Sequence, residues 1–464
     1  MNKFKTLIIL LLTAASIYSQ DISGEWNGIL KVQGMQLRLI FHISANDAGY
    51  TGTLDSPDQG AKGLPLSSVE FSDSSIIINA DKLGLEYSGK LESEERINGT
   101  FKQAGQSFPL ELTREVPEKE VIRRPQEPVK PYPYIEEEVR FAGGDSGVTL
   151  AGSLTFPQNG TKFPAVILIT GSGQQNRNEE LMGHKPFLVL ADYLTRNGIA
   201  VLRYDDRGTA ESTGEFKSAT SLNFTYDVLS AIKYLKTRKE IESDKIGLIG
   251  HSEGGLIAPI AAVKSDDVSF IVLMAGPGTP GEKILLQQNE IIAKLSGMSE
   301  EKIKSQLENV KGVFDIVVNT ENTDTLKTKL KHYINKRIDE HKIEVPASMN
   351  KEELISLQLS QLSSPWMKYF LSYDPAVNLR KVKCPVLAIN GSKDVQVLPE
   401  NLKIIESALN EGGNKNVTIK EFPGLNHLFQ ECSTGLMNEY STIEQTISPE
   451  ALREISGWIK NQIR

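Results

Sequence analysis

Cysteine is almost absent from this sequence, which has two in 464 residues, Cys384 and Cys432. Cys384 opens a short apolar segment that we predict to be a strand, and Cys432 follows a loop at the far end of that strand. Such a strand spans roughly 20 Å, whereas disulfide-bonded α-carbons lie within about 7 Å of each other. The sequence therefore predicts two free, mostly buried thiols and excludes a scaffold built on disulfide bonds.

An excess of positive charge is absent as well. Lys and Arg number 51 against 59 Asp and Glu, which gives a net charge of −8 at pH 7. Proteins that bind nucleic acids or anionic membranes present basic surfaces, so we expect neither as a partner. None of the six histidines stands at a metal-ligand spacing, and we predict no metal or other cofactor.

Long hydrophobic runs are also missing. The longest N-terminal run, Leu7 to Leu12, follows two lysines and leads to a polar end at Ser19 and Gln20. It is too short to cross a bilayer, and its flanks are typical of a signal peptide over residues 1–20. Because no cysteine lies near its end, we predict no lipid anchor. We expect cleavage near Ser19 or Gln20 and export to the periplasm or the medium.

Period-two alternation dominates residues 21–115. Leu37, Leu39, Phe41 and Ile43, for example, alternate with Gln36, Arg38, Ile40 and His42, which are mostly polar. About eight such segments separated by polar turns predict a small up-and-down β-barrel. Gly24-Glu25-Trp26 on the first segment resembles the opening of lipocalins.

A different pattern begins after residues 116–134, a stretch with five prolines that we predict to be an extended linker. In residues 135–464, short apolar segments alternate with helical patterns, which indicates a mostly parallel sheet covered on both faces. The predicted strands are 165–169, 199–202, 246–249, 270–273 and 386–389. Residues 281–375 interrupt the alternation with helical patterns alone, so we predict a helical lid inserted at the carboxyl edge of the sheet.

The segment Gly250-His-Ser-Glu-Gly254 lies between a predicted buried strand and a predicted buried helix. A G-x-S-x-G sequence in that setting is typical of a nucleophile elbow, in which a strained turn lifts the serine hydroxyl above the sheet. Side chains two residues before and after Ser252 would collide, which explains the two glycines. The sequence therefore predicts Ser252 as a nucleophile.

Candidates for the partners of Ser252 follow later strands. Asp394 follows the strand 386–389, and His427 follows the next one, so the order is serine, aspartate, histidine. In this arrangement His427 would take the serine proton and Asp394 would orient the imidazole. Asp374 is our second choice for the acid. We expect His251, although it neighbours the nucleophile, to serve packing.

Two backbone amides must stabilise the oxyanion of such a reaction. One is expected from Glu253, at the start of the elbow helix. The other should come from the glycine-rich loop Thr170-Gly-Ser-Gly-Gln174, where Ser172 and Gly173 are the candidates.

These motifs resemble the α/β-hydrolase superfamily. Gly250–Gly254, Gly391–Asp394, Gly424–His427 and Asp205–Gly208 carry the match, and they resemble bacterial serine esterases with a helical lid and a small β-rich N-terminal domain. The resemblance implies an ester hydrolase with a small-molecule substrate, in which Asp206 and Arg207 brace loops.

Three functions stay open: an exported esterase, a serine peptidase or amidase of the same fold, and a binding protein with an inert hydrolase domain. The peptidase would need an acidic anchor in the lid for a free amino terminus. Near the end of the lid, Trp366 and Phe370 share a helical face with Tyr369 and Tyr373. That face either packs the lid onto the core or lines the substrate pocket.

Overall fold

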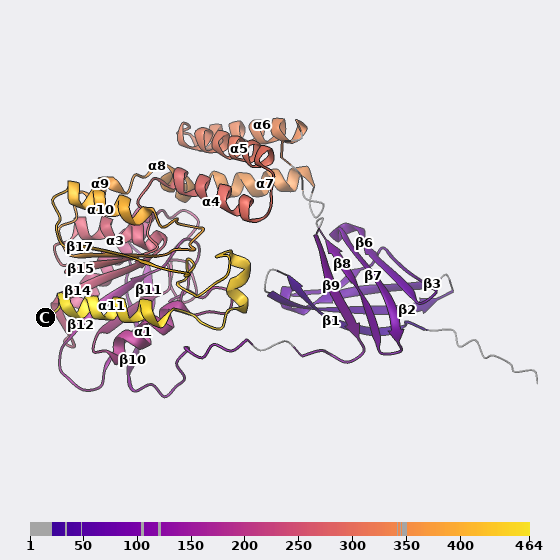
Figure 1. Cartoon of the computed structure of the whole chain (residues 1–464), viewed down its shortest axis with the longest axis horizontal. Helices are drawn as coiled ribbons and strands as arrows, with labels where there is room; N and C mark the ends of the chain where they lie inside the picture. The colour runs from indigo at the N-terminus through magenta and orange to yellow at the C-terminus, as the bar shows by residue number, and fades with distance from the viewer. Residues whose placement is uncertain are drawn as a thin grey trace, which may run out of the picture. The chain divides into compact units, whose positions relative to one another are not determined.

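Figure 1 shows a computed structural model of the chain, in which residues 21–32, 35–47, 49–103, 106–118, 122–340, 342–343, 345 and 350–464 are described. The predicted signal peptide, residues 1–20, lies outside the described residues. The chain divides into two compact units with a boundary between Lys119 and Glu120.

The first unit is a closed antiparallel barrel. Each strand pairs with its neighbour in the order β2-β1-β9-β8-β7-β6-β5-β3, and β3 pairs in turn with β2, which closes the ring. The strands are β1 Gly24–Val32, β2 Met35–Asn46, β3 Gly49–Ser56, β4 Ala61–Pro65, β5 Ser68–Ser72, β6 Ser75–Ala80, β7 Leu85–Ser93, β8 Arg96–Gln103 and β9 Gln106–Thr113. The short β4 pairs with β3 alone among the described strands. The predicted barrel is confirmed.

The alternation of apolar and polar side chains along the strands explains why the interior of this barrel is filled with apolar side chains. Trp26, Phe41 and Tyr87 are fully buried, since every second side chain points inward. The Trp26 indole nitrogen donates to the carbonyl of Ile22 at 2.9 Å, and the Arg114 guanidinium lies 3.8 Å over the same ring. The aromatic core therefore has its polar atoms satisfied.

The second unit contains a sheet in the order β10-β11-β13-β12-β14-β15-β16-β17. From β13 onward all pairings are parallel, whereas β11 runs antiparallel to both of its neighbours. The strands are β10 Tyr134–Ala142, β11 Thr149–Pro157, β12 Phe163–Ile169, β13 Ala200–Tyr204, β14 Ile241–His251, β15 Phe270–Met274, β16 Val386–Gly391 and β17 Val417–Phe422. This order, with helices on both faces, is the predicted α/β-hydrolase fold, which is confirmed.

Two apolar clusters cover the two faces of this sheet. One joins it to α2 (Ser221–Lys236), α3 (Glu253–Lys264) and α10 (Asn401–Glu411). The other joins it to α1 (Pro186–Arg196) and α11 (Pro449–Gln462). The central strands are buried on both sides, which is why they read as continuous apolar runs.

Helices are the only regular secondary structure among the described residues between 281 and 372. We call this segment the lid. Its helices are α4 Gly281–Leu295, α5 Glu300–Val318, α6 Thr323–Asp339, α7 Lys351–Leu362 and α8 Pro365–Ser372, drawn in orange tones in Figure 1, and the short α9 Ala376–Leu379 follows. Side chains of Ser299, Asn322, Asn350 and Ser364 accept backbone hydrogen bonds at the starts of α5 to α8. The lid has an apolar cluster of its own, centred on Val317, Leu330 and Ile334.

The second half of the predicted linker is bound to the hydrolase unit. The Arg124 guanidinium donates to the carbonyls of Ile443 at 2.7 Å and Ser441 at 2.8 Å. The Gln126 side chain accepts from the Thr446 amide at 2.6 Å and donates to the Ile447 carbonyl at 2.6 Å. Of the predicted extended linker 116–134, the part from about Arg124 onward is thus an arm with fixed hydrogen-bond partners.

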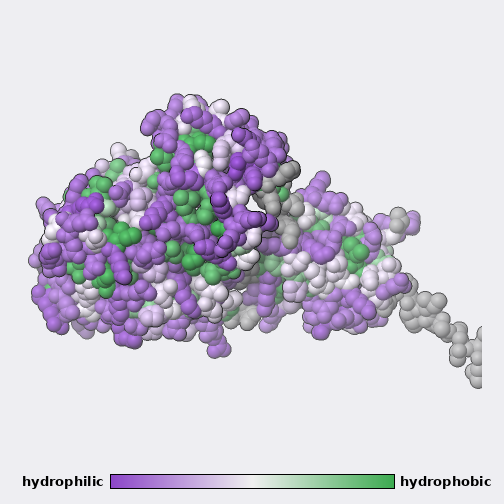
Figure 2. Space-filling view, turned by 45° about the horizontal axis from the view of Figure 1, so that its top comes forward, coloured by the Kyte–Doolittle hydropathy of each residue, from purple (hydrophilic) through white to green (hydrophobic). Residues whose placement is uncertain are grey.

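Cys384 and Cys432 are both unbonded and partly buried, which confirms the prediction of free thiols. No helix in the described part of the chain is both long and apolar enough to span a bilayer. On the face shown in Figure 2, hydrophilic residues predominate and apolar ones form smaller patches between them.

Candidate active site

Ser252 occupies a strained turn between β14 and α3. Its backbone angles are φ 52° and ψ −116°, an uncommon region for a residue with a side chain. The turn is fixed from both sides, because the Ser252 amide donates to the carbonyl of Met274 at 2.8 Å and its carbonyl accepts from Gly255 at 2.9 Å. This is the strand–turn–helix geometry that the sequence predicts for a nucleophile elbow.

The glycines of the elbow have no room for a side chain. A β-carbon on Gly250 would lie 2.0 Å from the Gly254 carbonyl oxygen, and one on Gly254 would lie 2.1 Å from the Ile169 oxygen. The close approach of Gly254 to Ile169 also brings the elbow helix against the end of β12. Both glycines therefore serve the turn, as expected from the sequence.

Asp394 and His427 form a buried pair. Asp394 Oδ2 lies 2.7 Å from His427 Nδ1, and the two residues are 1% and 4% exposed. The other carboxylate oxygen accepts from the amides of Gln396 at 2.8 Å and Val397 at 2.9 Å. A carboxylate held in this way only accepts, so Nδ1 of His427 donates to it, and Nε2 is the ring nitrogen left for another partner.

The loop that carries His427, residues 423–432, lies against the elbow. We call it the base loop. The ring of His251, the residue before Ser252, lies 4.8 Å from the His427 ring between centroids, and its Nε2 is 2.9 Å from the His427 carbonyl oxygen. Our second choice for the acid, Asp374, instead accepts from the amide of Ala376 at the start of α9.

The loop after β12, residues 170–178, passes beside Ser252, and we call it the oxyanion loop after its predicted role. A β-carbon on Gly171 would come within 3.3 Å of Ser252 Cβ. The amide of Gly171 already donates to Glu179 Oε1 at 2.7 Å. The next amides, those of Ser172 and Gly173, stay the predicted second donors beside that of Glu253.

Asp206 and Arg207 brace the surroundings of this loop, as the resemblance implied. Asp206 accepts from the Thr170 hydroxyl at 2.8 Å and the Gln175 amide at 3.0 Å. Burial raises the pKa of Asp206 well above its usual value, although these hydrogen bonds oppose the shift. Arg207 pairs with buried Asp227 at 2.7 Å.

Glu253 has a second role that the sequence did not reveal. Its buried carboxylate accepts from the Ser221 hydroxyl at 2.6 Å and from the Trp366 indole at 2.8 Å, which ties the lid to the residue after Ser252. Burial raises the pKa of Glu253, while the two hydrogen bonds partly offset the rise. The contact between Trp366 and Glu253 joins residues more than a hundred positions apart, and no local sequence pattern predicts it.

The aromatic face of α8 packs onto α3. Trp366 and Phe370 stack with centroids 4.9 Å apart, and Phe370 is buried in a cluster with Leu256 and Ile260. Packing thus accounts for Phe370. A contact of Trp366 or Phe370 with substrate stays a prediction.

Other histidines have partners outside this site. His184 is fully buried between the Thr446 hydroxyl and the Tyr440 carbonyl, at 3.0 and 2.7 Å. In the barrel unit, His42 contacts Asp55 at 3.1 Å. Among the described residues, no group of three or more His, Cys, Asp or Glu side chains is arranged to hold a metal ion.

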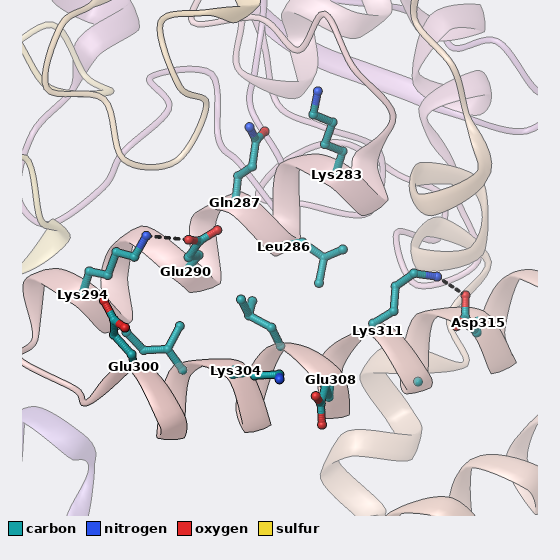
Figure 3. Close-up of a pocket in the computed structure, with 13 residues that line it drawn as sticks. Lys283, Leu286, Gln287, Glu290, Lys294, Glu300, Lys304, Glu308, Lys311 and Asp315 are labelled. Carbon is teal, nitrogen blue, oxygen red and sulfur yellow. Dashed lines mark hydrogen bonds and ion pairs between the residues drawn. The ribbon is translucent and has the colours of Figure 1, made fainter.

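A groove of about 830 Å³ lies between α4 and α5 of the lid, as Figure 3 shows. Charged side chains border the groove. Among them, Lys294 forms an ion pair with Glu290, and Lys311 forms one with Asp315. None of the predicted site residues lines it. The groove therefore belongs to the lid surface and is separate from the candidate site.

Comparisons with known proteins found similar chains. Esterase EstD of Thermotoga maritima is 28% identical over 303 residues, which cover 65% of this chain and 61% of the esterase, so the chain spans less than two thirds of that protein's length. Dipeptidyl peptidase 8 of Homo sapiens is 29% identical over 155 residues, 32% of this chain and 17% of the peptidase. The solved structure of Pyrococcus furiosus esterase Pf2001 aligns with a TM-score of 0.44 at 16% identity, over 75% of this chain and 98% of that one. A family model described as X-Pro dipeptidyl-peptidase (S15 family) matches residues 146–420, more than half of the chain, and the chain therefore belongs to the S15 family.

Proposed function

We propose that this protein is an exported serine hydrolase that cleaves carboxylic esters through an acyl intermediate on Ser252. The observation that supports the proposal most is the buried pair of Asp394 and His427 beside an elbow that strains Ser252. A serine hydroxyl is a weak nucleophile until a base takes its proton, and a neutral imidazole with a protonated Nδ1 has its basic nitrogen available.

In the proposed reaction, Ser252 Oγ attacks the ester carbonyl carbon while His427 Nε2 takes the hydroxyl proton. Asp394 stabilises the imidazolium that forms. The proton then passes to the leaving alcohol as the carbon–oxygen bond breaks. A water molecule, deprotonated by the same imidazole, releases the acid and restores Ser252.

Negative charge on the carbonyl oxygen would be met by the amide of Glu253 and by that of Ser172 or Gly173. Glu253 is the first residue of α3, so its amide has no partner within the helix and lies at the positive end of the helix dipole. The proximity of Gly171 to Ser252 supports the oxyanion loop as the second source. Losing one such donor typically costs about 100- to 1,000-fold in kcat.

Peptide cleavage is the second candidate, because the family is described by a dipeptidyl-peptidase activity. An aminopeptidase-like enzyme needs a carboxylate for the substrate's amino group. Two carboxylates at the elbow are already engaged: Glu179 accepts from Gly171 and His251, and Glu253 from Ser221 and Trp366. An ester substrate needs no such anchor, which favours the esterase.

The test is the turnover of nitrophenyl esters and of an Xaa-Pro anilide by the wild type and by Ser252→Ala. We expect the wild type to cleave the esters and the variant to cleave neither substrate. Preferential anilide cleavage would replace the esterase by the peptidase, and no turnover of either substrate would favour an inert binding protein. Export rests on the sequence of residues 1–20, and the mass of the mature protein secreted by a bacterial host tests it.

A further inference from the structure

His251 is a buried titratable group that the proposed reaction does not use. It is 5% exposed, and each of its ring nitrogens faces an oxygen atom. Nδ1 lies 2.9 Å from Glu179 Oε1, and Nε2 lies 2.9 Å from the carbonyl oxygen of His427. The residue next to the nucleophile is thus hydrogen-bonded to the backbone of the base.

The partners of His251 decide its protonation state. The carbonyl of His427 can only accept, so Nε2 must donate. Glu179 Oε1 also accepts the amide proton of Gly171 at 2.7 Å, so it acts as an acceptor toward Nδ1 as well. A neutral ring would leave one lone pair facing an oxygen lone pair in a buried site, which is costly.

We propose that His251 is held as an imidazolium by Glu179, and that this pair positions His427 by linking the base loop to the oxyanion loop. Glu179 bonds the oxyanion loop through Gly171, His251 belongs to the elbow, and the base loop is held through the carbonyl of His427. The inference rests on the proposed function for its effect on rate, but not for the charge on His251.

Burial and charge support this assignment. Glu179 is 4% exposed, and among the described residues its second oxygen, Oε2, is buried without a hydrogen-bond partner. A buried carboxylate of this kind needs a cation, and His251 is in direct contact with it. Burial alone would lower the pKa of His251, but the charge and hydrogen bond of Glu179, the His427 carbonyl and the charge of Asp394 together raise it.

The pH dependence of the rate follows from the groups that face His251, which are Glu179, the His427 carbonyl and ring, and, at longer range, Asp394. When His251 loses a proton at alkaline pH, one of its two hydrogen bonds breaks and His427 is no longer fixed. The alkaline side of the profile for kcat should therefore report His251. Removal of the negative charge of Glu179 should move that side to lower pH.

The kinetic test compares Glu179→Gln and His251→Gln with the wild type. For Glu179→Gln we expect kcat to fall about 10- to 100-fold with little change in KM, and the alkaline side to move down by about one pH unit or more. In His251→Gln, kcat should be low at every pH without that alkaline titration. The double variant should be no slower than His251→Gln, because the two residues act as one unit.

Thr195→Val is the matched control. Its hydroxyl contacts that of Thr155 at 2.7 Å in the core between α1 and β11, away from the reaction centre. We expect this variant to melt at a lower temperature but to keep the wild-type pH profile. If Glu179→Gln also keeps the wild-type profile, the positioning role is refuted.

A measurement independent of activity tests the charge itself. In full-length protein labelled with ¹⁵N in the histidine rings, the resonances absent from His251→Gln belong to His251. We expect both of its nitrogens to carry protons at pH 8, where an exposed histidine is neutral. A neutral His251 at pH 8 would overturn the proposal even if Ser252→Ala confirms the hydrolase. A charged His251 in a protein that cleaves no ester would refute only the proposed function.

Discussion

His427 Nδ1 lies 2.7 Å from Asp394 Oδ2, while Oδ1 of the same carboxylate accepts the amide protons of Gln396 and Val397. The two oxygens thus have separate tasks. One fixes the aspartate to its own loop, and the other fixes the tautomer of the histidine.

This division predicts the effect of Asp394→Asn. The asparagine oxygen can keep the two amide contacts, so its amino group must face Nδ1 and favour the wrong tautomer of His427. We expect kcat to fall by about 10⁴-fold with a melting temperature close to that of the wild type. Near-normal turnover would mean that another residue orients His427.

Ser252→Ala should abolish ester turnover, with a loss on the order of 10⁶-fold in kcat. It should also abolish labelling by a fluorophosphonate probe, which reacts only with an activated serine. Ser218→Ala, a change at an exposed serine, is the control and should label like the wild type. Labelling that survives in Ser252→Ala would identify a different nucleophile.

The bond between Trp366 and Glu253 predicts that the lid influences the reaction. In Trp366→Ala the Glu253 carboxylate loses a donor in a buried site and the lid loses its link to the elbow. We expect a higher KM for esters and a shifted preference between short and long acyl chains, worth roughly 1–3 kcal/mol of discrimination. Phe370→Ala, which removes a ring packed on Leu256 and Ile260, should mainly lower the melting temperature. An unchanged chain-length profile in Trp366→Ala would limit this face to packing.

The arm at residues 122–133 should contribute to the stability of the hydrolase unit. Arg124→Ala removes donors from the carbonyls of Ile443 and Ser441, and Gln126→Ala frees the Thr446 amide. We expect each change to lower the melting temperature of that unit. The effect should be larger for Arg124→Ala, since a hydrogen bond from a charged group contributes about 1.5–3 kcal/mol and one from a neutral group about 0.5–1.5 kcal/mol. Arg123→Ala, at an exposed neighbour, should leave it unchanged. Equal melting temperatures in all three variants would show that the arm is a spacer.

His184 predicts how stability depends on pH. Burial lowers the pKa of His184 to about 4, with a further decrease from nearby Arg124, against an ordinary value near 6.5. Between about pH 4 and pH 6.5, His184 therefore binds a proton in the unfolded chain but not in the folded protein. The free energy of unfolding decreases as the pH falls through this range. In His184→Gln, urea unfolding at a series of pH values should show a shallower loss across that window. His332→Gln, at an exposed position of the lid, should keep the wild-type slope.

The sequence predicted where the candidate residues stand in the fold, because their positions depend on strand order. Ser252, Asp394 and His427 follow β14, β16 and β17, and parallel strands bring their carboxyl ends to one edge. Their roles in a reaction stay predictions. The barrel was predictable for a similar reason, because alternation of side chains has a fixed period in a strand.

The partners supplied by tertiary structure were not predictable. Glu179 stands in a polar loop with no periodicity. Its hydrogen bond with His251 forms only because the tertiary structure brings this loop next to the elbow. Arg124 binds backbone carbonyls more than 300 positions away, and a carbonyl group has no signature in the sequence. For these reasons the sequence predicted an extended linker but not the partners that hold its second half.

The position of the lid between β15 and β16 has a consequence for folding. These strands are neighbours in the sheet, yet the chain between Met274 and Val386 must close before they pair. A loop of that length costs about 1 kcal/mol more to close than an ordinary crossover of roughly 30 residues, if it is flexible. A lid that forms its own helices and apolar cluster first shortens the effective loop. Lid formation should therefore precede the joining of β16 and β17, the strands that lead to Asp394 and His427, so the hydrogen-bonded pair of these two residues is expected to be assembled late during folding.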